Sequence, residues 1–260
     1  MKKKSESKPR EVLGIDIGGS GIKGAVVDVK TGEFLSERLR IPTPKPYSVE
    51  GVLGAIEQIV DGLKWSGTIG CGFPGVVRAQ VIESALNLGE SFTGVNLAEE
   101  IGRRCACNAW VLNDADAAGS AEVKFGAGRG KKGVVLMLTV GTGIGAGLFI
   151  NGTLVPNMEF GSLKMRDKKS GKIVIAERLC SDAARKKCDL SWTEWASRFN
   201  RYLQYVHSLV WPDLIILGGG VCSKSEKFLK KLDVKCDLAL AELENKAGIV
   251  GAAYEASLKF

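Results

Sequence analysis

A carboxylate at position 114 is the clearest candidate for proton transfer in this sequence. Asp114 follows an apolar run, residues 109–112, that predicts a strand, and it precedes a run of small residues, 115–124, that predicts a helix. A carboxylate at such a junction is well placed to accept a proton from a substrate hydroxyl. Side chains at this position also cap helices, so the residues alone equally allow Asp114 or Asp116 to be a helix cap.

Three glycine-rich turns, each directly after an apolar strand, have the composition of phosphate sites. Glycine lets a ligand approach the backbone, and the N–H groups of such turns can hold phosphate oxygens. A single turn of this kind is as well explained by a tight hairpin, but three of them favour phosphate binding. Asp16, just before the first turn, is the candidate ligand for Mg²⁺. The candidate residues for binding a phosphoryl donor are Asp16, Gly18, Gly19, Ser20, Gly21, Lys23, Thr139, Gly141, Thr142, Gly143, Gly218, Gly219 and Gly220.

Several common active-site patterns are missing from the chain. The phosphate-binding motif G-x-x-x-x-G-K-[ST] does not occur, and the first turn does not have the G-x-G-x-x-G spacing of dinucleotide-binding folds. The nucleophile motif G-x-S-x-G is also absent. The single histidine, His207, lies among apolar residues with helical spacing, and we interpret it as a packing or surface residue.

Charge and hydropathy limit the partners of this chain of 260 residues. Its formal net charge is +7, and a positive field concentrates polyanions such as polyphosphate or nucleotides. Aromatic residues are not interleaved with the basic clusters, so we expect no nucleic-acid surface. No run of eighteen apolar residues occurs, so we expect no membrane span.

The cysteines and the first ten residues indicate a cytoplasmic protein. The seven cysteines are odd in number and form no C-x-x-C pair, which favours reduced thiols over disulfides. We expect Cys105 and Cys107 to alternate on a strand edge, without a zinc site. Residues 1–10 are rich in lysine and predict a disordered basic tail without the apolar stretch of a signal peptide.

The elements that must position these residues repeat one pattern in the two halves of the chain. Residues 12–17 and 23–28 predict two antiparallel strands joined by the first glycine turn, and residues 133–140 and 146–150 repeat this arrangement around the second. We expect a third strand over residues 33–41 and helices over residues 48–64, 96–104, 191–210 and 246–258. A repeated strand, glycine turn and strand indicates a duplicated α/β architecture.

Taken together, these motifs resemble the ROK family of sugar kinases, in particular its polyphosphate glucokinase branch. The matching segments follow one another in order over nearly the whole chain: residues 14–24, 72–76, 85–87, 112–119, 138–145, 151–161, 211–220 and 247–253. The resemblance implies a duplicated actin-like (ribonuclease H-like) ATPase fold, with two lobes and a cleft between them. We accordingly expect a small N-terminal lobe over residues 11–113 and a larger C-terminal lobe over residues 114–245. Residues 246–260 would form a helix that packs near the lobe junction.

The resemblance also implies roles for individual residues. Asp114 would be the general base that acts on the sugar 6-hydroxyl, and Asn87, Asn113 and Glu159 would bind sugar hydroxyls. The resemblance further implies a hexose as acceptor, inorganic polyphosphate or ATP as donor, and a homodimer. The zinc motif of many family members is missing, as it is in the polyphosphate glucokinase branch.

One departure from the family pattern concerns the sugar site. Where the family has Glu-Phe-Gly-His-Leu-Glu, this chain has Ser162 and Lys164 at the places of the histidine and the second glutamate. An unmatched buried polar contact costs on the order of 1–3 kcal/mol, which weakens glucose binding roughly tenfold or more. Lys164 could instead hold an anionic group of another substrate or of the donor. Two alternatives to a polyphosphate glucokinase therefore stay open: a catalytically impaired sensor that binds polyphosphate or a sugar phosphate, and an ATP-dependent kinase for another sugar.

Overall fold

The computed structural model describes residues 10–85 and 88–260, which divide into two compact units. The first unit contains the chain up to Ala121 together with Asn245–Phe260, and the second contains Glu122–Glu244. The lobe boundaries expected after residues 113 and 245 stay a prediction. Residues 1–9 of the expected tail lie outside the described residues, and Arg10 donates a hydrogen bond of 2.9 Å to Asp28.

The first unit is built on a mixed sheet whose main path has the strand order β3-β2-β1-β5-β8. Strands β1 and β2 are antiparallel, whereas β1, β5 and β8 run parallel to one another. The strands are β1 (Glu11–Gly18), β2 (Gly21–Asp28), β3 (Glu33–Phe34), β4 (Leu39–Ile41), β5 (Ile69–Phe73) and β8 (Ala109–Asn113), with a separate hairpin of β6 (Val77–Arg78) and β7 (Val81–Ile82). The helices are α1 (Val49–Gly62), α2 (Leu97–Cys105), α3 (Asp114–Phe125, which continues into the second unit), α7 (Ala247–Ser257) and the short 3-10 helix η1 (Glu90–Phe92).

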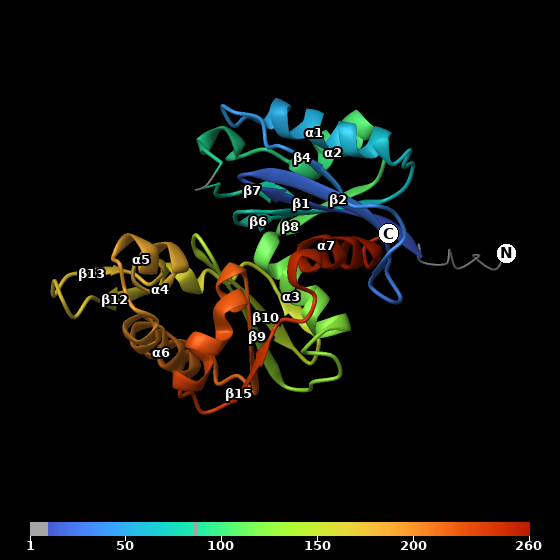
Figure 1. Ribbon diagram of the computed structural model, residues 1–260. Helices are drawn as coiled ribbons and strands as arrows, with labels where there is room; N and C mark the ends of the chain where they lie inside the picture. The colour runs from blue at the N-terminus through green and yellow to red at the C-terminus, as the bar shows by residue number, and fades with distance from the viewer. Residues whose placement is uncertain (1–9, 86–87) are drawn as a thin grey trace. The chain divides into compact units, whose positions relative to one another are not determined.

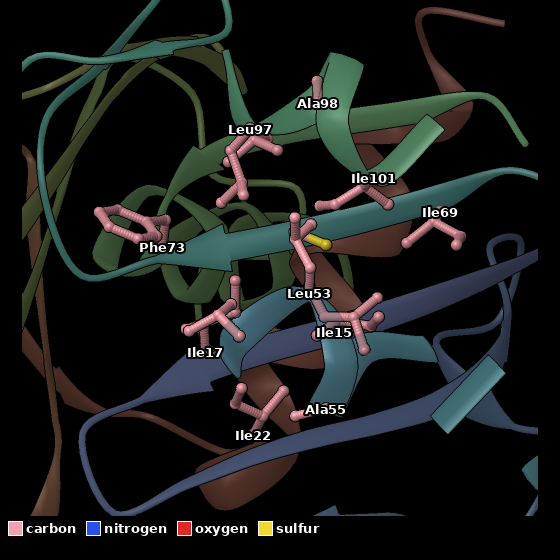
Figure 2. Close-up of a cluster of buried hydrophobic side chains, with 14 of the residues drawn as sticks. Ile15, Ile17, Ile22, Leu53, Ala55, Ile69, Phe73, Leu97, Ala98 and Ile101 are labelled. Carbon is pink, nitrogen blue, oxygen red and sulfur yellow. The ribbon is translucent and has the colours of Figure 1, made fainter. Parts of the chain in front are cut away.

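Alternating side chains direct the two faces of this sheet toward different helices. Ile15 and Ile17 point into the core beneath α1 and α2, where Figure 2 shows them with Ile69 and Phe73 of β5. The opposite face carries glycine at Gly14 and Gly70, and α7 packs directly on it there (Figure 1). A Cβ atom built on Gly14 would lie 2.0 Å from the carbonyl oxygen of Ile249. These glycines therefore permit close contact between helix and sheet.

The second unit repeats the strand order of the first, which confirms the duplicated α/β architecture. Its sheet has the order β11-β10-β9-β14-β15, again with two antiparallel pairs followed by two parallel pairs. The strands are β9 (Val134–Val140), β10 (Ile144–Ile150), β11 (Thr153–Val155), β14 (Leu214–Gly218) and β15 (Asp237–Leu240), with a separate hairpin of β12 (Lys164–Arg166) and β13 (Ile173–Ile175). The helices are α4 (Glu177–Cys180), α5 (Asp182–Lys187), α6 (Trp192–Val210) and the 3-10 helices η2 (Phe160–Ser162), η3 (Gly220–Lys227), η4 (Leu229–Lys231) and η5 (Glu244–Lys246).

Helix α6 supplies most of the aromatic core of the second unit. Ser191 and Glu194 form the expected capping box at its N-terminus. Trp195 stacks on Phe199 with ring centroids 4.8 Å apart, and its indole N–H donates to the carbonyl group of Cys180. His207 is buried on the same helix, as expected for a packing residue, with Nε2 3.3 Å from the carbonyl oxygen of Lys235. None of the described helices is long and apolar enough to cross a membrane.

Two predictions about local structure were wrong. Residues 33–41 form two short strands, β3 and β4, which pair with opposite ends of β2. They are not one strand because, in the gap between them, the hydroxyl group of Ser36 accepts a hydrogen bond from the N–H of Val26. Cys105 and Cys107 do not lie on a strand. Cys105 ends α2, and Ala106 then turns the chain with a positive φ of 49°.

A buried carboxylate joins the two places where the chain passes between the units. Glu122, the first residue of the second unit, is fully buried. It accepts hydrogen bonds from the backbone N–H groups of Ala127 at 3.0 Å, Glu242 at 3.1 Å and Leu243 at 2.7 Å. Glu242 and Leu243 immediately precede the return of the chain to the first unit at Asn245. The entry and exit of the second unit are therefore bonded to one another.

Candidate active site

The first glycine turn joins β1 to β2, and side chains hold its carbonyl groups in place. Tyr47 donates to the carbonyl oxygen of Gly19 at 2.8 Å, and Arg40 donates to that of Ser20 at 2.8 Å. Thr43 donates to the carbonyl oxygen of Gly18. In a trans peptide the N–H points opposite to the carbonyl group, so the N–H groups of Gly19 and Ser20 face away from these side chains. The turn is therefore held so that two N–H donors, those of Gly19 and Ser20, lie on the side opposite Thr43 and Tyr47.

Sequence reasoning did not identify Arg40, Thr43 and Tyr47. The prolines of residues 42–46 indicated only a break in regular structure. The signal that could have found Arg40 is its place opposite Lys23, in the register of β4 with β2.

Asp16 and Lys23 form an ion pair next to the first glycine turn. They are opposite residues of β1 and β2, so both side chains lie on the same face of the sheet. Lys23 Nζ is 3.0 Å from Asp16 Oδ2, and both side chains are partly buried. A Cβ atom built on Gly248, near the N-terminus of α7, would lie 3.3 Å from Asp16 Oδ1. The carboxylate is therefore flanked by an ammonium group and by the positive end of a helix.

Asn113 accepts from two of the first free N–H groups of α3, whereas Asp114 accepts from one. The side-chain oxygen of Asn113 accepts from the N–H groups of Ala115 at 2.8 Å and Asp116 at 3.0 Å, and its amide nitrogen donates to the carbonyl oxygen of Gly75. This is the pattern of an N-cap residue. Asp114 also accepts from the N–H of Ala115, at 2.8 Å, and is only partly buried. A capping role thus fits Asn113 better than Asp114, while sugar binding by Asn113 stays a prediction.

Asp16 and Asp114 lie at the same edge of the sheet, on either side of Gly72. Gly72 of β5 is the register partner of Asp16 on β1 and of Leu112 on β8. A Cβ atom built on Gly72 would lie 3.5 Å from the Cα atom of Asp114, on the same face of the sheet as Asp16. Both residues therefore lie beside Gly72 at the carboxyl ends of parallel strands, where ligands bind in open α/β sheets.

The second unit brings its two glycine turns together in the corresponding place. Gly218, the last residue of β14, is the register partner of Thr139 on β9. A Cβ atom built on Gly219 would lie 2.5 Å from the carbonyl oxygen of Val140, so the third turn packs on the end of β9. The second turn is held by a bond from Gly141 N–H to the carbonyl oxygen of Gly143, 3.0 Å long. The third and second turns therefore form one glycine-lined surface, which includes Gly141, Thr142, Gly143, Gly218, Gly219 and Gly220.

Two glutamates adjoin the second glycine turn. Glu177 Oε2 lies 2.7 Å from the position of a Cβ atom on Gly143. Partial burial of the carboxyl group, and then the negative charge of Glu177, raise the pKa of Glu159. The sequence predicted Glu159 but carried no motif for Glu177. Of the other residues predicted for the sugar site, Ser162 ends η2, Lys164 begins β12, and Asn87 lies outside the described residues.

The carboxylates available for a metal ion suit a cation that arrives with its substrate. No group of three or more histidine, cysteine, aspartate or glutamate residues within the described ranges could form a metal cage. Mg²⁺ usually binds to phosphates through one or two protein carboxylates and retains several waters. Asp16, beside the first glycine turn, provides one such carboxylate and so fits this binding mode.

Comparisons with known proteins agree on one family. A family model described as the ROK family matches residues 12–159. A polyphosphate glucokinase of Mycobacterium tuberculosis (strain CDC 1551 / Oshkosh) is 41% identical over 245 residues, which cover 94% of this chain and 90% of that protein.

Solved structures show the same relationship in three dimensions. The inorganic polyphosphate/ATP-glucomannokinase of Arthrobacter sp. strain KM is 40% identical with a TM-score of 0.89, and the match covers 97% of this chain and 100% of that one. A ROK family glucokinase of Streptomyces griseus, solved with glucose and AMPPNP, is 25% identical with a TM-score of 0.79 and coverage of 94% and 98%.

Proposed function

Because this chain belongs to the ROK family, with its actin-like ATPase fold, we propose that it is a hexose kinase that transfers a phosphoryl group from inorganic polyphosphate, and also from ATP, to the sugar 6-hydroxyl. The observation that carries the proposal is the placement of Asp16 and Asp114 as neighbours of Gly72 on one face of the sheet. The proposed base, Asp114, and the carboxylate proposed for the donor's metal ion, Asp16, thus lie at one end of the sheet, next to the first glycine turn.

The proposed mechanism assigns the chemistry to residues of this chain. Asp114 accepts the proton of the sugar hydroxyl while the hydroxyl oxygen attacks the terminal phosphoryl group of the donor. The N–H groups of Gly19 and Ser20, together with Lys23, stabilise the negative charge of the donor. Glu159 binds sugar hydroxyls. Asp16 would hold Mg²⁺, which would supply further neutralisation of that charge.

A purely sensory role is less well supported. Ser162 and Lys164 motivate that alternative, but Asp16, Asp114 and the glycine turns of a phosphotransferase are all present. The Mycobacterium tuberculosis and Arthrobacter relatives, matched over 90% and 100% of their length, are kinases by name. We therefore favour the enzyme.

A coupled assay on the Asp114→Asn variant tests the proposal. The asparagine oxygen can still accept from the N–H of Ala115, so we expect the fold to be retained. Loss of the base should lower kcat by roughly 10²–10⁴-fold. The matched control is Asp61→Asn on the exposed surface of α1, which should leave kcat unchanged. Equal activity of the Asp114→Asn variant and the control would refute the assignment of the base.

The donor, the acceptor and the metal are tested in one kinetic matrix. Polyphosphate and ATP are each combined with a panel of hexoses, with Mg²⁺ present or removed by a chelator. We expect phosphorylation of glucose with polyphosphate and no turnover after removal of the metal. Transfer with ATP alone would point to an ATP-dependent kinase, and no transfer to any sugar would support the sensor. We further propose a cytoplasmic homodimer, for which light scattering of the purified protein should give twice the mass of 27.8 kDa.

A further inference from the structure

The second unit has a hollow that none of the residues assigned above explains, apart from Lys164 at its end. It lies between the β12–β13 hairpin, α4 and α6, which Figure 1 shows together at one end of that unit. The main cavity has a volume of about 510 Å³ and is continued by a smaller one of about 310 Å³, since Met165 and Arg201 line both. We call it the basic groove, and its cationic residues are Lys164, Arg166, Lys168, Lys169, Arg198 and Arg201.

The positive charge of the basic groove is not compensated by ion pairs. None of its six cationic side chains forms a salt bridge within the described part of the chain. The groove also contains two carboxylates, Asp167 and Glu194, and both interact electrostatically with Arg198. Asp167 accepts from the hydroxyl group of Ser170 at 2.6 Å, and Glu194 accepts from that of Ser191 at 2.6 Å. Six cations and two carboxylates leave a net charge of +4 along the groove, which creates a local potential that attracts an extended anion.

The floor of the groove supports its cations and adjoins the second glycine turn. Met165, Leu179 and Leu190 form an apolar floor, against which the aliphatic stems of lysine and arginine can pack. Leu179 and Cys180 belong to α4, which also carries Glu177 beside Gly143. Just beyond α4, the N–H of Ala183 bonds to the carbonyl oxygen of Gly141 at 3.2 Å. One segment thus contacts the turn of the proposed donor site and also lines the groove.

We propose that the basic groove binds a stretch of inorganic polyphosphate remote from the phosphoryl group that is transferred. The inference rests on the proposed function, because it assumes that a long polyphosphate is the donor. A triphosphate has only three phosphates, whereas a long polyphosphate has enough of them to contact the glycine turn and all six cations of the groove. A nucleic acid fits less well, because binding of single strands relies on aromatic side chains that stack on bases, and Tyr205 is the one aromatic residue among those that line the two cavities.

Binding of the donor to variants of the full chain tests the groove directly. The variant Lys169→Gln with Arg198→Gln removes two groove cations, neither of which donates a side-chain hydrogen bond in the structure. Its control, Lys230→Gln with Lys235→Gln, removes the same charge from exposed positions of the second unit outside the groove. Calorimetric titration with long-chain polyphosphate, without hexose, should show about tenfold weaker binding to the groove variant than to the control.

The salt dependence adds a second measure. Loss of two phosphate contacts should reduce the slope of log affinity against log salt concentration by about 1.5, since each contact contributes roughly 0.7–0.9. Equal losses of affinity in both variants would overturn the proposal, because they would indicate only the general charge of the protein. Displacement of polyphosphate by a single-stranded DNA of equal charge, as effectively as by polyphosphate itself, would also overturn it.

Kinetics separate failure of the groove from failure of the proposed function. For the groove variant, the ratio of KM for long-chain polyphosphate to KM for tripolyphosphate should rise about tenfold above that of the control. An unchanged ratio in an active enzyme would overturn the groove and leave the kinase intact. Groove-dependent binding in a protein that transfers no phosphate would support the groove and refute the kinase.

Discussion

Substitution of Gly70 by alanine should destabilise the first unit through a single methyl group. Gly70 lies on β5, on the face of the sheet that α7 covers. A Cβ atom there would be 2.0 Å from the carbonyl oxygen of Ala252 and 2.4 Å from its carbonyl carbon. Ordinary contacts begin at 3.4 Å, so α7 and β5 would have to separate by more than 1 Å. The obstacle is backbone, which cannot rotate away as a flexible side chain can.

The loss of stability expected for Gly70→Ala depends on the other contacts of α7. The same helix lies 2.0 Å from the position of a Cβ atom on Gly14 and packs Gly251 against Ala117, so a shift that relieves one contact disturbs the others. Overpacking of a well-packed core costs typically 1–3 kcal/mol. The reduced entropy of the unfolded chain returns roughly 0.5–1 kcal/mol. We therefore expect a net loss of about 1–2 kcal/mol from the free energy of unfolding.

Urea denaturation followed by circular dichroism measures this loss, with Gly54→Ala as the matched control. Gly54 lies inside α1, and nothing is within 4 Å of the position of its Cβ atom. Alanine there should stabilise the protein by roughly 0.5–1 kcal/mol, since it favours a helix over glycine. The same substitution thus has opposite signs at the two sites. A Gly70→Ala protein as stable as the wild type would refute the argument that the glycine face exists to admit α7.

Three further substitutions test the site and its surroundings. Tyr47→Phe removes the donor to a carbonyl group of the first glycine turn, and it should cost about 0.5–1.5 kcal/mol of stability in urea denaturation and raise KM for the donor. Glu177→Gln removes a negative charge that raises the pKa of Glu159, so NMR titration of Glu159 should give a lower pKa than in the wild type. Burial raises the pKa of Glu255, so its ionisation destabilises the folded state, and stability falls as the pH rises through that pKa. Glu255→Gln, which can still accept from Ser120, should therefore stabilise the protein at neutral pH, with a smaller gain under acidic conditions, as measured by urea denaturation at several pH values.

Each of these expectations has a contrary outcome. An unchanged KM for the donor in Tyr47→Phe would mean that the turn does not need this bond. An unchanged pKa of Glu159 in Glu177→Gln would show that burial alone perturbs it. A Glu255→Gln protein that loses stability at neutral pH would show that the carboxylate is ionised and favourably paired in the folded state.

The sequence was most informative where the pattern is local. The helix expected over residues 191–210 agrees with α6, whose start is marked by a capping box of two residues only three positions apart, Ser191 and Glu194. The strand expected over residues 146–150 ends at Asn151 and Gly152, a dipeptide typical of hairpin turns, and both residues have positive φ, 52° and 82°, where β10 pairs with β11. The antiparallel strand pairs that flank the first two glycine turns could be predicted from the apolar runs before and after each turn.

The sequence was less informative where distant segments meet. Gly14 and Gly70 precede or follow no turn, and their role depends on α7, which comes from the other end of the chain. The sequence offered Asp114 or Asp116 as the helix cap, whereas Asn113 has the N-cap pattern in the structure, because the choice depends on which side chain turns back to the helix. Glu177 was missed because its place beside Gly143 depends on the fold of α4, and no sequence motif marks it.

The bonds of Glu122 have a consequence for how this protein can be dissected. The Glu122 carboxylate, at the start of the second unit, is hydrogen-bonded to residues just before the end of that unit. The second unit is therefore an insertion in the chain of the first unit, and its two ends are adjacent. Insertions with neighbouring ends tend to be tolerated and exchangeable. Since α3 runs through residue 122, exchange of the second unit with that of a related kinase should keep the whole of α3 together with the segment that contains Glu242 and Leu243.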